Sequence, residues 1–323
     1  MMKILTPEEI ADILRQKDNI QIFMHRSPDG DTIGCAYALC MALQRLGKNV
    51  RAVCSDEIHK KYSYITDKVK KQDFTPGFFI SVDIASTQLL GEQYKDYYDK
   101  IDLLIDHHGS NTGFAKCGYV DSTSAACTEI VAEVIRKMGV SIDRDIANAI
   151  FTGICTDTGC FKYSNVTAKT HIDAADMISC GADCAYICRL MFDTKSKSRI
   201  DIERMALESL EFYEDNKIAL ICITKQMIDA SGADESDTEG IAALPRQVEG
   251  ALIGITIREK ENGEFKISAR SAGDINVSKM CSLFGGGGHI AAAGCSIHGT
   301  ADYAKEQIVS AAVDTLKEYP GEQ

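Results

Sequence analysis

Short apolar runs alternate with helical patterns through the first half of the chain. Four runs predict strands, because each is short, apolar and followed by polar or turn-forming residues: 20–26, 49–55, 78–84 and 101–108. Residues 33–48 and 122–139 predict helices that end at Gly47 and Gly139. Strands that alternate with helices predict an α/β domain with a mainly parallel sheet flanked by helices.

Two further helices frame this domain. Thr6 is the expected N-cap of the first one, with Pro7 in its first turn and Glu9 completing a capping box. Residues 143–159 begin as a helix and run into a loop rich in glycine and threonine, which contains Asp157. These patterns extend the first domain to about residue 190.

The pattern changes in the second half of the chain. Residues 191–215 are charged and helical, which predicts a linker between two domains. The run 217–224 predicts a strand, and residues 251–271 predict a hairpin around Asn262-Gly263. A short helix, a further strand and a C-terminal helix follow. The expected layout is therefore a domain at 1–190, a helical linker at 191–215 and a smaller α/β domain with a mixed sheet at 216–323.

Composition and charge narrow the class of protein. With 45% hydrophobic and 25% charged residues, and no run that approaches a membrane span, the chain is expected to be soluble, away from membranes and cytoplasmic. The net charge of −12 argues against a broad basic surface for long duplex DNA, but allows a small phosphate ligand. The thirteen cysteines include no CxxC pair. We interpret most of them, including the evenly spaced Cys180, Cys184 and Cys188, as small buried residues of a reducing compartment rather than metal ligands.

Acidic and imidazole side chains gather where predicted strands end. Parallel strands present their carboxyl ends at one rim, where ligands bind. Taken singly, each of these side chains fits a turn or a cap. Taken together, eight of them predict a site for hard cations: His25, Asp29, Asp31, Asp83, Asp106, His107, His108 and Asp157.

This donor set indicates which ions to expect. Carboxylates and imidazoles without cysteine favour Mn²⁺, with Mg²⁺ as the alternative, over structural Zn²⁺. The number of donors exceeds what one ion needs, so we expect two divalent cations about 3.5–4 Å apart. Such a pair lowers the pKa of a bridging water and clamps the oxygens of a phosphoryl transfer.

Several short motifs resemble those of one enzyme superfamily. "HRSPDGDTIG", Val82-Asp83, "DHHGSN" and "TGICTDTGCFKYSN" resemble, in this order, motifs I to IV of the DHH phosphoesterases. "FGGGGHIAAAG" resembles the glycine-rich signature of the DHHA1 domain. The resemblance covers nearly the whole chain. Size and layout are most similar to the nano-RNase/pAp phosphatase proteins, which degrade very short oligonucleotides and remove the 3′-phosphate from 3′-phosphoadenosine 5′-phosphate (pAp).

The resemblance implies a ligand set in which one residue bridges the two ions. His25 and Asp29 would hold one Mn²⁺, Asp31 and His107 would hold the other, and Asp83 would bridge both.

Three further residues receive implied roles. Asp157 would complete the coordination of an ion that the sequence does not specify. Asp106 would orient His107 or His108, and His108 would face the scissile phosphate. The expected catalytic residues are therefore Asp83, Asp106 and His108.

The second domain carries candidates for substrate binding. Consecutive glycines leave backbone N–H groups uncovered and can wrap a phosphate, although a flexible loop or tight packing explains them too. Arg270 is either a phosphate clamp or an ordinary surface arginine. In the first domain, Ser122, Thr123 and Ser124 either cap the expected helix or direct its amides at a phosphate. The resemblance implies that the second domain grips the terminal phosphate or nucleotide of the substrate. The candidates are Arg270, Gly286, Gly287, Gly288 and His289.

The expected function is a two-metal phosphoesterase for small nucleotides. Its substrates would be short single-stranded RNA or DNA, pAp or pApA, and a homodimer is expected by analogy. The alternative is the same chemistry on cyclic di-AMP or its product pApA, which no residue distinguishes. A non-catalytic nucleotide-binding regulator is disfavoured, because no motif position has been lost. A purely structural α/β protein would leave the strand-end ligands unexplained.

Overall fold

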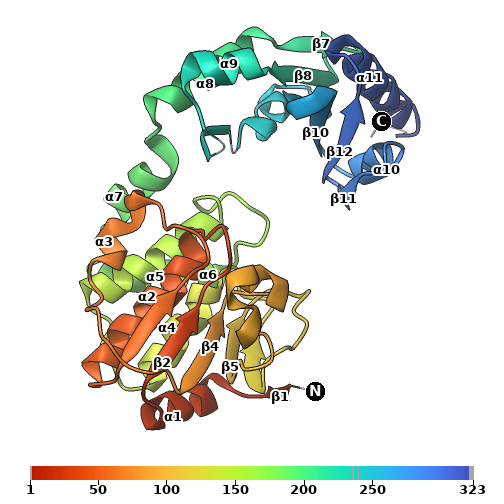
Figure 1. Ribbon diagram of the computed structural model, residues 1–323. Coiled ribbons are helices and arrows are strands. Elements are labelled where there is room, and N and C mark those ends of the chain that lie inside the picture. The colour runs from red at the N-terminus through yellow and green to blue at the C-terminus, as the bar shows by residue number, and fades with distance from the viewer. Residues whose placement is uncertain (1, 235, 239, 320–323) are drawn as a thin grey trace. The chain divides into compact units, whose positions relative to one another are not determined.

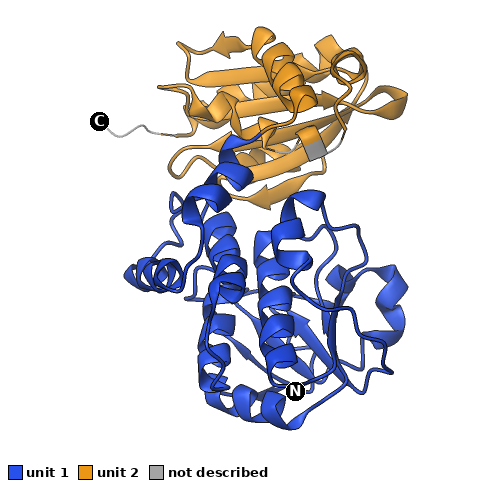
Figure 2. Ribbon diagram, turned by 90° about the vertical axis from the view of Figure 1, so that its left-hand side faces the viewer, with its two compact units in different colours: residues 1–194 blue, residues 195–323 orange. Residues whose placement is uncertain are grey.

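The chain is divided into two compact units, residues 1–194 and 195–323 (Figure 2). The computed structural model describes residues 2–234, 236–238 and 240–319. Each unit has its own six-stranded sheet and its own hydrophobic core. No helix in the described part of the chain is both long and apolar enough to span a bilayer.

Unit 1 contains the first predicted domain. Its helices and strands are β1 (Lys3–Ile4), α1 (Pro7–Gln16), β2 (Ile20–Phe23), α2 (Gly30–Arg45), β3 (Val50–Val53), α3 (Ser63–Thr66), β4 (Phe78–Val82), β5 (Leu103–Asp106), β6 (Cys117–Val120), α4 (Cys127–Lys137), α5 (Arg144–Asp157), α6 (Ala168–Ser179) and α7 (Cys184–Cys188). Short 3-10 turns occupy 60–62, 87–90 and 92–97, and a π-helical turn occupies 189–193. Strands and helices alternate from β1 to β4, as the sequence predicts, whereas β4, β5 and β6 follow one another without an α-helix between them and precede α4, α5, α6 and α7.

The six strands of unit 1 are all parallel, in the order β1-β6-β5-β4-β2-β3. The chain passes from β2 outward to β3 and then returns to the other side of β2 to form β4. The strand order therefore reverses between β2 and β4. Such a switch point opens a crevice beyond the carboxyl ends of the two strands.

Different layers cover the two faces of this sheet. Ile20, Ile22 and Ile80 point into the main core, which they share with α1, α2, α4 and α5. Phe23 and Leu104 point the other way, into a smaller core covered by the short turns at 87–97. Helices on one face and aromatic-rich turns on the other bury both faces, as a parallel sheet requires.

Two helix starts of unit 1 differ from the prediction. The helix predicted from residue 33 begins at Gly30, because the Asp29 side chain caps it. Thr6 and Glu9 form the capping box of α1. Ser122–Ser124 were predicted to start a helix, but α4 begins at Cys127. Thr123 and Ser124 instead hydrogen-bond to Asp121 in a turn. The helix start is displaced because a carboxylate from elsewhere in the fold takes the place of a local cap, as described below.

Unit 2 is built on a mixed sheet in the order β11-β12-β10-β9-β8-β7. Its helices and strands are α8 (Lys197–Glu208), β7 (Glu211–Tyr213), β8 (Ile218–Ile223), α9 (Lys225–Ser231), β9 (Ile253–Glu259), β10 (Glu264–Ser271), α10 (Val277–Ser282), β11 (Gly287–His289), β12 (Ala292–His298) and α11 (Ala301–Lys317). Short 3-10 turns occupy 236–238, 241–243, 245–247 and 261–263. The hairpin turn predicted at Asn262-Gly263 joins β9 and β10, and both residues have positive φ.

The segment predicted as a helical linker is divided between the units. Within residues 191–215, α8 packs Ile202 and Ala206 against Ile221 and Ile223 in a core of unit 2. β7 pairs with β8 at the edge of the second sheet. The helical pattern was therefore recognised, but its apolar face belongs to unit 2 and not to a free connector.

Candidate metal centre

The predicted ligands follow neighbouring strands at the switch point of unit 1. His25 lies two residues beyond β2, Asp83 follows β4 directly, and Asp106 is the last residue of β5. β4 pairs with both β2 and β5, so the three strand ends lie next to one another (Figure 1). The sheet register thus brings together residues that are far apart in the chain.

Asp83 lies between two histidines. Its Oδ2 is 3.7 Å from the Nε2 of His25, and its Oδ1 is 3.5 Å from the Nε2 of His107. The side chain is 3% exposed, and its Oδ1 atom has no hydrogen-bond partner. A backbone φ of 57° turns Asp83 out of the strand direction. A buried oxygen without a donor is costly unless something else, such as a cation, satisfies it.

The donor atoms form three overlapping groups. In each group the atoms lie within 4.8 Å of one another. The groups are His25, Asp29 and Asp83; Asp31, His107 and Asp157; and Asp83, His107 and His108.

These spacings suit shared ions. Bonds of about 2.1 Å in an octahedron place neighbouring ligand atoms about 3 Å apart and opposite ones about 4.2 Å apart. The Nε2 of His107 lies 3.9 Å from Asp31 Oδ2 and 3.3 Å from Asp157 Oδ2. The Nε2 of His25 lies 3.5 Å from Asp29 Oδ1.

Both histidines present the same nitrogen to the carboxylates. The Nδ1 of His25 lies 2.8 Å from the Arg26 carbonyl, and the Nδ1 of His107 lies 3.1 Å from the Ser124 carbonyl. A carbonyl oxygen only accepts, so each Nδ1 carries the proton of the neutral ring. The lone pair of each Nε2 is then directed at the carboxylates, in the arrangement typical of metal-binding histidines.

Asp31 is held by the start of another helix. Its carboxylate accepts hydrogen bonds from the backbone N–H groups of Cys127 (2.6 Å) and Thr128 (3.0 Å), and from the Thr128 hydroxyl (2.8 Å). Asp31 therefore caps α4 from 96 residues away, which explains why that helix begins without a local cap. Thr128 was missed by the sequence reasoning, because nothing near it in the chain indicates this contact.

Glycines allow α2 and α5 to approach closely at the site. A β-carbon on Gly30 would lie 2.4 Å from the Thr156 hydroxyl, and one on Gly153 would lie 2.5 Å from Asp31 Oδ1. This close crossing brings Asp157, the last residue of α5, to Asp31 and His107. The sequence left open which ligands Asp157 accompanies, and the structure places it with these two.

Negative charge accumulates in this region. Burial raises the pKa of Asp31, and burial together with the charge of Asp31 raises the pKa of Asp83 well above its usual range. The same two causes raise the pKa of Asp157 to about 8. Protein groups alone do not balance these carboxylates, and divalent cations would.

His108 is oriented by a pair of residues. Its Nδ1 lies 2.7 Å from Asp106 Oδ1, and Asn111 donates to the other oxygen of Asp106. Burial alone would raise the pKa of Asp106, but these hydrogen bonds lower it. The hydrogen bond to Asp106 raises the pKa of His108. Asp106 also accepts from the His107 backbone N–H (2.8 Å). The choice between the two histidines is thus resolved in favour of the His108 side chain, and Asn111 is a further residue that sequence reasoning missed.

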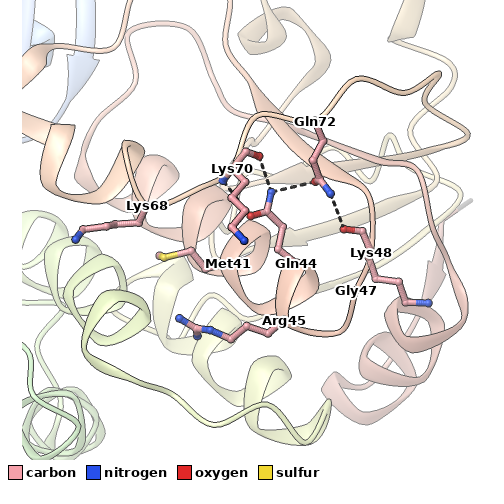
Figure 3. A pocket seen from close by; sticks show the side chains of 8 residues that line it. All are labelled: Met41, Gln44, Arg45, Gly47, Lys48, Lys68, Lys70 and Gln72. Carbon is pink, nitrogen blue, oxygen red and sulfur yellow. Dashed lines mark hydrogen bonds between the residues drawn. The ribbon is translucent and has the colours of Figure 1, made fainter.

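A hollow of about 260 Å³ opens over the donors. It is lined by His25, Asp29, Asp83, Leu89, His108 and Asp157. A second hollow, of about 440 Å³, lies at the far end of α2 (Figure 3). Its Arg45 and Lys68 pair with Asp143 and Asp145, and its Gln44 and Gln72 hydrogen-bond to nearby backbone. Of these two hollows, the first is the one lined by the clustered carboxylate and imidazole donors.

The substrate-binding candidates of unit 2 share one face of its sheet. Arg270 on β10 and His289 on β11 both pair with Ala292 on β12, which lies between them. Residues directly opposite in antiparallel strands point to the same face, so a guanidinium and an imidazole flank a small side chain. Arg270 is half-buried and His289 is exposed.

Part of the glycine run lies in a strand, because Gly287 and Gly288 belong to β11. A β-carbon on Gly286 would lie 2.2 Å from the Gly294 carbonyl, and one on Gly288 would lie 2.5 Å from the Ala292 carbonyl. Close packing on β12 therefore explains these two glycines. A β-carbon on Gly287 would meet nothing within 4 Å, so packing does not require that glycine.

Two family models match the chain. The DHH family, N-terminal domain, matches residues 19–154, and the DHHA1 domain matches residues 217–319. A bifunctional oligoribonuclease and PAP phosphatase NrnA from Thermus thermophilus is 31% identical over 95% of this chain and 93% of that protein. The chain belongs to the DHH family.

Other DHH proteins show the breadth of the likeness. The cyclic-di-AMP phosphodiesterase GdpP from Geobacillus thermodenitrificans is 24% identical over 87% of this chain, but this covers only 45% of that protein. Among solved structures, an exopolyphosphatase-related protein from Bacteroides fragilis superposes with a TM-score of 0.83. The two chains are 24% identical, and the superposition covers 97% of this chain and 96% of the Bacteroides chain. The two-domain DHH and DHHA1 fold expected from the motifs is confirmed.

Proposed function

We propose that this DHH protein is a metal-dependent phosphoesterase that hydrolyses very short oligonucleotides and pAp. The observation that carries the proposal is Asp83, whose two buried oxygens each face a different histidine. The relation to the NrnA protein of Thermus thermophilus supports the substrate class. A cytoplasmic location and a homodimer stay predictions.

The residues fit two hard cations. His25, Asp29 and Asp83 would hold one ion, and Asp31, His107, Asp157 and Asp83 the other. Oxygen and imidazole nitrogen without sulfur suit Mn²⁺, with Mg²⁺ as the alternative. When bound, the two ions would supply a water of lowered pKa and neutralise charge on the phosphate.

The chain's own groups position the substrate. The hydrogen bond between its Nδ1 and Asp106 holds His108 in one orientation. Its side chain is 43% exposed and lies beside the carboxylates. A protonated His108 would donate a hydrogen bond to the scissile phosphate or to the leaving oxygen. The hydrogen bond to Asp106 raises the pKa of His108, which favours this protonated form.

In unit 2, Arg270 and His289 would bind the terminal phosphate of the nucleotide. Their shared face and their spacing across Ala292 support this role. An arginine fork can bind two phosphate oxygens, and the uncovered backbone at Gly287 permits a close approach.

The alternative substrate is cyclic di-AMP or pApA. It is favoured by the likeness to the phosphodiesterase GdpP. The Thermus relative is more similar to this chain and matches over nearly its whole length, so short oligonucleotides and pAp remain the first choice.

A substrate panel tests the proposal. The purified protein, supplied with Mn²⁺ or Mg²⁺, is assayed on 5′-phosphorylated RNA di-, tri- and pentanucleotides, pAp, pApA and cyclic di-AMP. We expect turnover of the short RNAs and of pAp, and little of cyclic di-AMP. Failure to hydrolyse any short RNA or pAp would refute the proposal, and preference for cyclic di-AMP would favour the alternative.

A further inference from the structure

Three cysteines meet next to the candidate metal centre. Cys155 lies in the last turn of α5, Cys160 lies in the loop that follows, and Cys188 ends α7. We call these three residues the cysteine cluster. Their sulfur atoms lie within 4.8 Å of one another. All thirteen cysteines of the chain are free thiols.

The backbone directs these thiols together. Cys160 donates its N–H to the Cys155 carbonyl at 2.7 Å, which folds the loop back over the end of α5. Cys160 and Phe161 have φ values of 58° and 63°, in the left-handed region that residues with a β-carbon seldom adopt. Two such residues in succession mark a loop that the surrounding fold holds in one conformation.

The sulfur spacing is that of a metal-thiolate site. The Sγ of Cys188 lies 3.6 Å from that of Cys155 and 3.8 Å from that of Cys160. Zinc–sulfur bonds of about 2.3 Å in a tetrahedron place the sulfur atoms about 3.8 Å apart. The distances from Cys188 to Cys155 and to Cys160 therefore match the edges of such a tetrahedron.

We propose that the cysteine cluster is a second metal site, which binds one thiophilic cation, Zn²⁺ in the first instance. Three thiolates would occupy three positions and water the fourth, and the three thiol protons would pass to the solvent. Cys160 and Cys188 are half-buried, so an ion can enter from outside. Sulfur donors select soft ions, whereas the oxygen-rich centre selects hard ones.

The location of the cluster gives the site a structural role. Asp157 lies between Cys155 and Cys160 in the chain, at the turn that the ion would hold. Cys188 is followed by the π-helical turn that ends unit 1. A cation bound here would tie the end of α5 to α7 and restrain the backbone on both sides of Asp157.

Cobalt provides a test that does not depend on hydrolysis. Co²⁺ bound to thiolates gives intense charge-transfer absorption in the near ultraviolet, and Co²⁺ bound to carboxylates and imidazoles does not. With Mn²⁺ present, we expect the reduced protein to develop this absorption to saturation at one Co²⁺ per chain. Zn²⁺ should then displace Co²⁺ and abolish the band.

Variants locate the ion. We expect Cys160→Ser and Cys188→Ser each to weaken Co²⁺ binding at least about tenfold. Cys180→Ser is the matched control, since Cys180 is half-buried in the same unit but outside the cluster, and it should bind Co²⁺ as the parent does. Asp83→Asn should also keep the band, which separates this site from the proposed catalytic centre.

Three results would overturn the inference. The first is the absence of thiolate absorption in the reduced protein, and the second is an unchanged band in both cluster variants. The third is a cobalt band of the reduced protein that Zn²⁺ does not displace. Circular dichroism of each variant confirms that the loss of binding is not a loss of fold.

Discussion

Buried carboxylates in the two units have opposite electrostatic surroundings. In unit 1, burial and mutual repulsion raise the pKa values of Asp83 and Asp157. In unit 2, burial would raise the pKa of Glu203, but Lys195 and Arg199 hydrogen-bond to it and lower that pKa. The chain supplies its own cations for Glu203, whereas the proposed divalent ions would supply them for Asp83 and Asp157.

This difference indicates which buried carboxylates contribute to folding stability and which are available for function. A carboxylate that the protein has already neutralised contributes to folding, and one that it has left unpaired lowers stability until a cation binds. Asp106 combines features of both kinds of carboxylate. It lies in the candidate metal centre, but it is hydrogen-bonded to His108 and Asn111. Substitutions at these positions should therefore affect different measurable properties.

Asp83→Asn should have the largest effect. We expect kcat on pAp to fall at least about a thousandfold, because the amide cannot bridge two cations. The thermal midpoint of the metal-free variant should rise, because the replaced carboxyl group has a raised pKa in the folded protein and therefore lowers stability above its ordinary pKa. Calorimetry in chelator and steady-state kinetics in Mn²⁺ measure the two effects. Unchanged turnover would contradict the bridging role.

Asp106→Asn should have a smaller effect on activity. The variant loses the carboxylate that orients His108, and we expect kcat to fall about 10–100-fold. Bound Mn²⁺, measured by elemental analysis, should stay at the parent level because Asp106 is not among the clustered donors. A loss of metal equal to that of Asp83→Asn would show that Asp106 acts as a ligand instead.

Arg270→Ala extends the comparison to an unpaired cation. Among the described residues, no carboxylate pairs with Arg270, and its guanidinium donates to the Ala269 carbonyl. We expect KM for pAp to rise about tenfold with kcat within about twofold, because Arg270 would hold the phosphate and not take part in bond breaking. Lys266→Ala is the matched control, since Lys266 is an exposed cation on the same face of β10. Equal effects of the two variants would leave no specific role for Arg270.

Glu203→Gln should change stability and leave activity as it is. Its carboxylate accepts from Lys195 Nζ at 2.7 Å and from Arg199 Nε at 2.9 Å, so we expect a loss of about 1–2 kcal/mol at pH 7. The folded pKa lies below the ordinary value of 4.5, so the stabilisation is present above that pH and disappears as the pH falls. Urea unfolding of the parent and the variant at pH 7 and below pH 4 measures the difference in stability. A loss of stability that persists below pH 4 would show that the ionised Glu203 carboxylate is not its cause.

Much of the fold and of the site could be predicted from the sequence. The strand ends at His25, Asp83 and Asp106 were visible because parallel strands give short apolar runs that finish in polar groups. The hairpin at Asn262-Gly263 was visible because its turn needs two residues of positive φ.

The rest depends on contacts between distant residues. Asp31 caps a helix that begins at Cys127, so the local pattern at Ser122–Ser124 predicted the wrong start. The glycine run resembled a loop, because its pairing with β12 is set by the register of the whole second sheet. The grouping of Asp157 with Asp31 required the close crossing of α2 and α5.

The donors of unit 1 extend from His25 to Asp157 along the chain. On the ribosome, an emerging polypeptide lacks its last donor until α5 has been synthesised. The proposed ion pair therefore cannot be held in full while the first half of unit 1 is still being translated. The donor set is complete only when α5 has been synthesised.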